Sequence, residues 1–167
     1  MAEPVSFHDF VALRSSALLR SAWLLTGDWA SAQDLVQETL GRVWVRWDRI
    51  TRRDAPDAYV RRVMMTTWLG WRRRRSHDEL PLGELPERPL STGAHEISEL
   101  RSSLLPALRS LPPRQRAVVV LRYFEDLTEA QVAEALGCAV GTVKSQCARA
   151  LAQLRVDPRL TDSRTHP

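Results

Sequence analysis

The sequence has few of the residues on which redox, metal and secreted-protein chemistry depend. Its two cysteines, Cys138 and Cys147, form neither a disulfide framework nor a zinc-binding pattern. The most apolar uninterrupted run, Ala117 to Leu121, is far too short to span a bilayer. The N-terminus carries Glu3 and Asp9 and lacks a basic stretch followed by an apolar one, so no secretory signal is expected. These absences predict a soluble, cytoplasmic protein without membrane insertion of its own.

Sequence patterns typical of enzymes are missing as well. The four histidines are scattered without metal-ligand spacing, and there is no glycine-rich phosphate loop, nucleophile elbow or catalytic triad pattern. We therefore expect a protein that is not an enzyme and that has no cofactor, no metal and no catalytic residue.

Charge is distributed unevenly along the chain, although the net charge is only +4. Residues 1–77 hold 13 arginines and 8 acids, residues 78–99 hold one arginine and 6 acids, and residues 100–167 hold 10 basic residues and 6 acids. The three segments therefore carry +5, −5 and +4. Two basic segments around an acidic spacer favour two modules that meet a polyanion. An arginine-rich proteome would also produce such patches, and Lys144 is the only lysine.

Apolar residues recur at helical spacing on both sides of the spacer, which predicts an all-α protein of two small helical domains joined by an acidic flexible linker. We expect boundaries at 1–77, 78–96 and 97–157, with a disordered tail at 158–167. Ser6 is placed to cap the first helix and Gly27 to end it, and Thr128 and Gln131 are spaced as a capping box. The predicted helices run from about Ser6 to Leu25, Trp29 to Trp47, Asp57 to Arg75, Ile97 to Ser110, Pro113 to Phe124, Glu129 to Leu136 and Gly141 to Arg155.

The strongest local pattern lies at residues 128–155, where two helices joined by a turn at Gly137 match a helix-turn-helix. Val143 and Cys147 belong to the apolar face of the second helix, whereas its polar, positive side suits the major groove of DNA. The alternative is an ordinary antiparallel helix pair with a solvated face. The candidate DNA-binding residues are Thr142, Lys144, Ser145, Gln146 and Arg149.

A second candidate surface is the helix at residues 57–75, which mixes arginines with tryptophans. Arginine neutralises phosphates and aromatic rings stack on exposed bases, so the mixture suits single-stranded or opening DNA. The alternative is that the tryptophans are core residues and that the arginines solvate the helix end. The candidates here are Arg61, Arg62, Thr66, Trp68, Trp71, Arg72 and Arg73.

These pieces, in this order, resemble the extracytoplasmic-function (ECF) sigma factors of bacterial RNA polymerase, and most of all an actinobacterial subgroup. The resemblance rests on LLTGDWASAQDLVQETLGRVW (24–44), DAYVRRVM (57–64) and the long segment from Leu111 to Gln146. It implies a sigma region 2 at residues 1–77 and a region 4 at residues 97–157. It further implies binding to core RNA polymerase, recognition of a duplex −35 element by the helix from Gly141, and melting of the −10 element by the helix from Asp57.

The resemblance also gives a role to a turn that has no functional weight by itself. Asp34, Leu35, Gln37 and Glu38 match the family's polymerase-binding surface. An anti-sigma factor is a further partner implied by the family. Three residues depart from the family pattern: Ala139 stands in place of a capping serine, Gln146 in place of a frequent arginine, and Thr66 in place of an asparagine near the melted strand.

Two other functions remain open from the residues alone. One is a conventional helix-turn-helix regulator that binds duplex DNA as a dimer without polymerase. The other is a helical adaptor that binds no nucleic acid, for which loss of arginines would be harmless.

Overall fold

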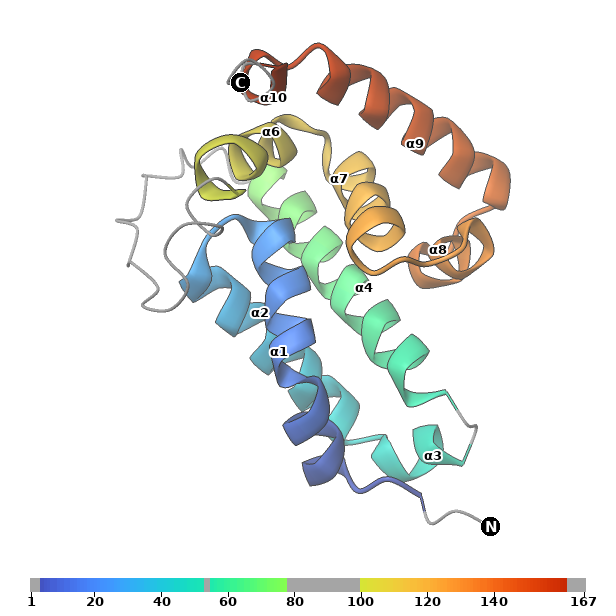
Figure 1. The fold of residues 1–167 in the computed structure, drawn as a ribbon. Coiled ribbons are helices and arrows are strands. Elements are labelled where there is room, and N and C mark those ends of the chain that lie inside the picture. Colours follow the sequence, from blue (N-terminus) through green and yellow to red (C-terminus); the bar gives the residue numbers. More distant parts are fainter. Residues whose placement is uncertain (1–3, 53–54, 78–99, 162–167) are drawn as a thin grey trace.

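The computed structural model describes residues 4–52, 55–77 and 100–161, and every regular element in these ranges is helical (Figure 1). The predicted all-α fold class is confirmed. The expected linker at residues 78–96 and the expected helix start at Ile97 lie outside the described residues.

The N-terminal part begins with two antiparallel helices, α1 (Phe7–Thr26) and α2 (Trp29–Trp44). Ser6 caps α1, because its Oγ accepts a hydrogen bond from the Asp9 backbone N–H at 3.1 Å. Gly27 ends α1 with a φ of 73°, a left-handed conformation that glycine adopts without strain. Asp28 then caps α2 by accepting the Ser31 N–H at 2.8 Å. The predicted cap at Ser6 and stop at Gly27 are confirmed.

The second predicted helix is interrupted earlier than expected, because α2 ends at Trp44 and a separate short helix, α3 (Trp47–Thr51), follows. The reason is the burial of Trp47. Its ring packs against Phe7 and Phe10, and its Nε1–H donates to the Val5 carbonyl oxygen at 3.1 Å. The third long helix, α4 (Pro56–His77), agrees closely with the prediction.

The C-terminal part is built from shorter helices. They are a π-helical turn η1 (Leu100–Leu104), α6 (Leu105–Ser110), α7 (Pro113–Val119), a second π-helical turn η2 (Val120–Phe124), α8 (Glu129–Leu136), α9 (Val140–Arg155) and α10 (Pro158–Thr161). The predicted capping box is present: the Gln131 N–H donates to Thr128 Oγ1 at 3.2 Å, and the Thr128 N–H donates to Gln131 Oε1 at 2.9 Å. Ala139 gives α9 no side-chain cap, as its residue type implies.

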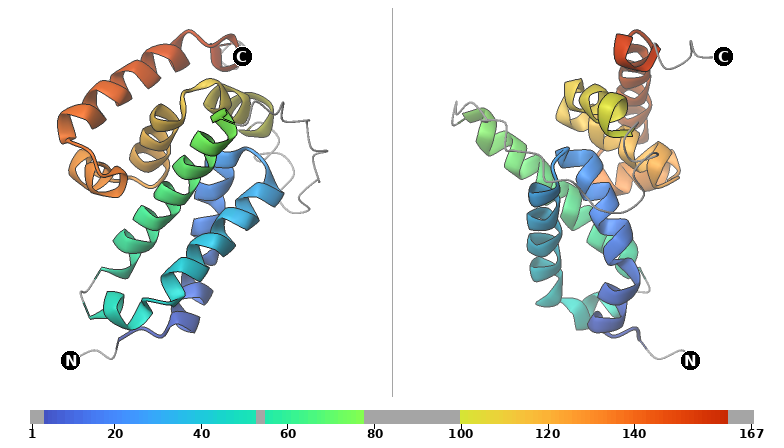
Figure 2. Two further views of the ribbon diagram at one scale, coloured as in Figure 1. Left: turned by 180° about the vertical axis from the view of Figure 1, so that it is seen from behind. Right: turned by 60° about the vertical axis from the view of Figure 1, so that its left-hand side comes forward.

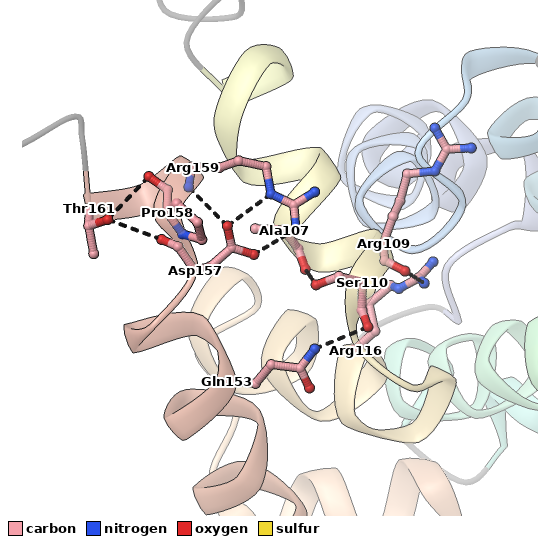
Figure 3. A network of polar contacts seen from close by, with 9 residues as sticks. All are labelled: Ala107, Arg109, Ser110, Arg116, Gln153, Asp157, Pro158, Arg159 and Thr161. Atoms are coloured by element: carbon pink, nitrogen blue, oxygen red, sulfur yellow. Dashed lines mark hydrogen bonds and ion pairs between the residues drawn. The ribbon is translucent and has the colours of Figure 1, made fainter.

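The tail expected to be disordered from residue 158 instead starts with the helix α10, so this prediction is wrong for residues 158–161. Asp157 caps α10 by accepting the Arg159 backbone N–H at 3.0 Å and pairs with the Arg159 guanidinium at 2.7 Å (Figure 3). Nearby, Gln153 Nε2–H donates to the Ser110 carbonyl oxygen at 3.2 Å. The Gln153 hydrogen bond joins the end of α9 to the end of α6, whereas the Asp157 contacts stabilise the start of α10.

The two parts of the chain share one hydrophobic core. Its fully buried members include Leu25 and Trp68 from the N-terminal part and Leu108, Leu121 and Val132 from the C-terminal part. Helix α4 packs against α7 and α8, and α1 packs against α6 and η2 (Figures 1 and 2). The sequence predicted two modules, and the structure shows that they are packed against each other.

Candidate nucleic-acid interface

The polar face of α9 is exposed, as the helical spacing predicts. Val143 and Ala150 are buried, and the main packing partners of α9 are α7 and α8. Four of the five candidate residues on α9 are exposed, and Gln146 is half-buried. Lys144 lies 3.8 Å from Glu129, a long ion pair between exposed groups that restrains the ammonium only weakly. The exposed side chains of this face are Thr142, Lys144, Ser145 and Arg149, of which Ser145 donates its hydroxyl to the Thr142 carbonyl oxygen at 3.0 Å.

A groove lined with arginines runs between α4 and the α2–α3 segment. It begins as a hollow of about 310 Å³ that contains Arg46, Arg49, Arg62 and Tyr59. A second hollow shares Arg46, Tyr59 and Arg62 with the first, and a third shares Arg42 and Thr66 with the second, so the three hollows adjoin one another. We call this feature the arginine groove, and its arginines are Arg42, Arg46, Arg49, Arg62, Arg73 and Arg74.

The guanidinium groups of this groove are mostly available to an outside anion. Within the described part of the chain, only Arg42 of the six arginines forms an ion pair, with Glu38 at 2.6 Å. All six arginines are exposed to solvent. A row of cations along a hollow, with an aromatic side chain and a hydroxyl between them, has the composition of a site for a nucleic-acid strand.

The structure separates the predicted −10 residues instead of bringing them together. Arg62, Thr66 and Arg73 line the arginine groove. Arg61 lies on the opposite side of α4, where its Nε–H donates to Glu125 Oε2 at 2.6 Å. Burial, followed by the charges of nearby Arg75 and Arg109, lowers the pKa of Arg72.

The two tryptophans of this set are not free aromatic surfaces. Trp68 is only 2% exposed and belongs to the shared core, so it cannot stack on a base in this conformation. Trp71 is half-buried, and its Nε1–H donates to Glu38 Oε2 at 2.8 Å. The interpretation of Trp68 as a core residue, left open by the sequence, is the one that its burial supports.

Sequence reasoning missed four residues of the groove: Arg42 on α2, Arg46 between α2 and α3, Arg49 on α3 and Tyr59 at the start of α4. The three arginines recur at intervals of four and three residues, which is a helical spacing, although the chain changes helix between them. That recurrence is the sequence signal that could have identified them.

The predicted polymerase-binding turn lies on α2 and is only partly exposed. Asp34 and Gln37 are exposed and Glu38 is half-buried, whereas Leu35 is fully buried in the shared core. Asp34, Gln37 and Glu38 border a hollow whose other side is formed by Trp71, Arg74 and Arg75 of α4. Leu35 therefore supports this surface from inside and presents no side chain on it.

A buried arginine connects the two parts of the chain, and no sequence pattern predicted it. Arg116 is 3% exposed, and it donates to the carbonyl oxygens of Leu25 at 2.7 Å and Arg109 at 2.8 Å (Figure 3 shows the Arg109 contact). Its guanidinium lies 5.5 Å from the centre of the Trp68 ring. Burial, followed by the charges of Arg72 and Arg109, lowers the pKa of Arg116 to about 10, so it stays protonated at neutral pH.

Within residues 4–52, 55–77 and 100–161 no three His, Cys, Asp or Glu side chains are grouped so that they could hold a metal ion. None of the helices in the described part of the chain is both long and apolar enough to cross a membrane. Cys138 and Cys147 are free thiols, each half-buried.

Comparison with known proteins gives each part of the chain a counterpart. The family model described as Sigma-70 region 2 matches residues 11–77, and the one described as Sigma-70, region 4 matches residues 101–154. Helices α1 to α4 thus correspond to region 2, and the helices from α6 to α9 correspond to region 4.

Similar proteins agree with this over nearly the whole length. The chain is 44% identical over 155 residues to the RNA polymerase sigma-E factor of Streptomyces coelicolor, covering 93% of this chain and 87% of that protein. It is 35% identical over 147 residues to the ECF RNA polymerase sigma factor SigL of Mycobacterium tuberculosis, covering 85% and 82%. Among solved structures, the sigma factor RpoE in complex with the anti-sigma factor NepR from Bartonella quintana has a TM-score of 0.73 at 25% identity, covering 89% and 94%.

Proposed function

Because the chain belongs to the extracytoplasmic-function family of RNA polymerase sigma factors, we propose that it binds core RNA polymerase and directs it to particular promoters. The protein acts in the cytoplasm, forms or breaks no covalent bond and uses no cofactor. The observation that carries the proposal is that the two matched regions expose two different basic surfaces, the face of α9 and the arginine groove.

The face of α9 suits a duplex −35 element. A helix fits the major groove of DNA, where Arg149 and Lys144 can donate to guanine oxygens or to phosphates and the hydroxyls of Thr142 and Ser145 can donate or accept. Since Ala139 supplies no capping acceptor, the first backbone N–H groups of α9 remain able to bind a phosphate. Recognition here is by rigid shape and hydrogen bonding.

The arginine groove suits the melted −10 strand. Its cations can follow the backbone of a single strand, and Tyr59 offers an aromatic ring beside Arg46 and Arg62. Melting then requires no catalysis: the groove binds the opened strand more strongly than the closed duplex and so shifts the equilibrium toward opening. Thr66 lines the same groove and can donate to a base or a phosphate.

The exposed turn of α2 suits the polymerase. Asp34 and Gln37 point outward from a helix that Leu35 anchors in the core, so a basic helix of the core enzyme can pair with them without rearrangement of the fold. An anti-sigma factor is a further proposed partner, because the structural relative RpoE was solved in complex with one.

The test of the proposed function is run-off transcription with purified core RNA polymerase on a library of promoters. We expect transcripts that depend on the protein and that start downstream of a shared pair of sequence elements. Substitution of Asp34 and Gln37 by alanine should abolish the transcripts while leaving duplex binding by α9 intact. If core polymerase initiates no better with the protein than without it, the proposal is wrong, and specific duplex binding in that case would identify a conventional regulator.

A further inference from the structure

Region 4 contacts α4 on both of its polar sides in this structure. Helix α8 packs across α4, and the segment that follows η2 brings Glu125 to the side that carries Arg61 (Figure 1). On the other side of α4, Glu134 of α8 lines the first hollow of the arginine groove. Glu134 therefore lies at the groove where the proposed function places DNA phosphates, and Glu125 occupies Arg61, the arginine of α4 that the sequence analysis also assigned to the −10 strand.

The contact between Arg61 and Glu125 is the tighter of the two. The distance from Nε to Oε2 is 2.6 Å, and the side chains are only 23% and 16% exposed. A charge-assisted hydrogen bond that is shielded from water is stronger than an ion pair on the open surface. While it persists, the guanidinium of Arg61 is not available to a nucleic acid.

Glu134 forms no direct ion pair with the described arginines of the groove, so it can act on them only through its charge. Its side chain is exposed at the rim of the hollow that contains Arg46, Arg49 and Arg62, and it has no ion-pair partner among the described residues. A carboxylate in that position reduces the positive potential of the hollow. An incoming phosphate would meet it at the entrance.

The face of α9 is arranged differently. Its helix packs mainly on α7 and α8, and α7 lies between it and α4 in Figure 1 and in the left view of Figure 2. Thr142, Ser145 and Arg149 are exposed in the same conformation in which Arg61 is occupied. The packing of the two regions thus covers one DNA-binding surface and leaves the other open.

The interface also contains a buried cation. Arg116 donates to the Leu25 carbonyl oxygen across the interface and lies over the Trp68 ring, while burial and the charges of Arg72 and Arg109 lower its pKa. Its hydrogen bonds offset part of the free energy that its desolvation costs. The interface is therefore held by apolar burial and by the Arg61–Glu125 ion pair, and the net contribution of Arg116 is reduced by its desolvation.

We propose that this packed state is self-masked: region 4 holds Glu125 and Glu134 against the arginines of α4 as substitutes for DNA phosphates, and it leaves the α9 face free. The inference rests on the proposed function, because it assumes that the arginines of α4 bind DNA. It assigns to the free protein an order of events in which α9 can engage duplex DNA before the α4 surface is uncovered.

The experiment compares Glu125→Gln and Glu134→Gln with Glu129→Gln as the matched control. All three variants remove one negative charge from region 4, but Glu129 pairs with Lys144 of the same region. Binding of a fluorescein-labelled oligothymidine is measured at low salt by anisotropy, and the radius of gyration of the double variant Glu125→Gln/Glu134→Gln is measured by X-ray scattering. We expect each masking variant to bind the single strand about three- to fivefold more tightly than the control does, and the double variant to be expanded.

Two failures can be distinguished. If the double variant stays as compact as the unsubstituted protein and each masking variant binds oligothymidine no more tightly than Glu129→Gln does, the mask does not exist. If the double variant expands but neither it nor the unsubstituted protein binds oligothymidine, the proposed single-strand role of α4 is wrong, and the masking role of region 4 fails with it.

Discussion

The face of α9 and the polar surface of α4 differ in how they are stabilised and in what they contact. The face of α9 is formed by a single helix of 16 residues, which buries Val143 and Ala150 and exposes its polar side. The surface of α4 is assembled from α2, α3 and α4, and it is contacted by region 4. The surface proposed to read duplex DNA therefore needs only one well-packed helix, whereas the surface proposed to hold the opened strand depends on the rest of the molecule.

The largest expected effect is a loss of stability when a residue of α4 in the shared core is truncated. Trp68→Ala removes a fully enclosed ring from between the two regions and should lower the free energy of unfolding by about 3–5 kcal/mol. Trp44→Ala is the matched control, because Trp44 is 61% exposed and should cost about 1 kcal/mol or less. Urea denaturation followed by circular dichroism measures both. Equal losses of unfolding free energy in the two variants would mean that the buried Trp68 contributes no more to stability than the exposed Trp44 does.

A smaller effect, on the affinity for duplex DNA, is expected from a substitution at the centre of the α9 face. Arg149→Ala should weaken binding to a −35 duplex selected from the library by about 1–3 kcal/mol, and it should leave initiation on a pre-melted template unchanged. Arg155→Ala removes the same charge from the last turn of the same helix and should change duplex binding much less. Comparable losses in both variants would show that α9 binds by charge alone.

The two neighbouring arginines of α4 provide a third comparison. Arg62 lines the groove and Arg61 is paired with Glu125, so Arg62→Ala should weaken binding to oligothymidine by about threefold at low salt. Arg61→Ala removes a cation but also breaks the mask, and its affinity should stay closer to that of the unsubstituted protein. Anisotropy titrations at two salt concentrations measure both variants. A larger loss for Arg61→Ala would reverse the assignment of the two sides of α4.

The sequence could predict features that depend on neighbouring residues. The capping box of Thr128 and Gln131, the cap at Ser6 and the buried side of α9 all involve positions a few residues apart, and all are confirmed. It could not predict contacts between distant positions. Arg61 and Glu125 are 64 residues apart, and Arg116 and Leu25 are 91 residues apart, so helical spacing carries no information about either pair.

The burial of Trp68 is likewise a feature that the sequence could not predict, although it concerns a single helix. Along α4 two arginines are followed by two tryptophans and then by four arginines, and their spacing alone cannot tell which side of the helix another part of the chain will cover. The packing of α7 and α8 against α4 decides that Trp68 is core while Arg62 remains exposed.

The smallest expected effect is a dependence of stability on pH at the contact between the regions. Burial raises the pKa of Asp28, but hydrogen bonds from Ser31 and Ala30 and the charge of Arg109 outweigh it and bring the pKa below its ordinary value of 3.8. A carboxyl whose pKa is lower in the folded protein stabilises the fold above pH 3.8, and this contribution is lost as the pH falls through the folded pKa. Asp28→Asn keeps a capping oxygen and should lower the free energy of unfolding at neutral pH by less than about 1 kcal/mol.

Urea denaturation at a series of pH values measures this contribution. The difference between Asp28→Asn and the unsubstituted protein should shrink as the pH falls below 3.8, because both then carry a neutral side chain. A difference that stays constant down to the acid limit would mean that the charge of Asp28 contributes nothing.

Gly27, described above as the stop of α1, also lies against a side chain of region 4. A Cβ atom at this position would lie 2.8 Å from Cδ of Arg109, so any larger residue would displace that exposed side chain. The φ of 73° is the stricter requirement, because it disfavours every residue with a Cβ atom whatever the space around it. Replacement of this glycine would therefore strain a turn of region 2 and move a cationic side chain of region 4 at the same time.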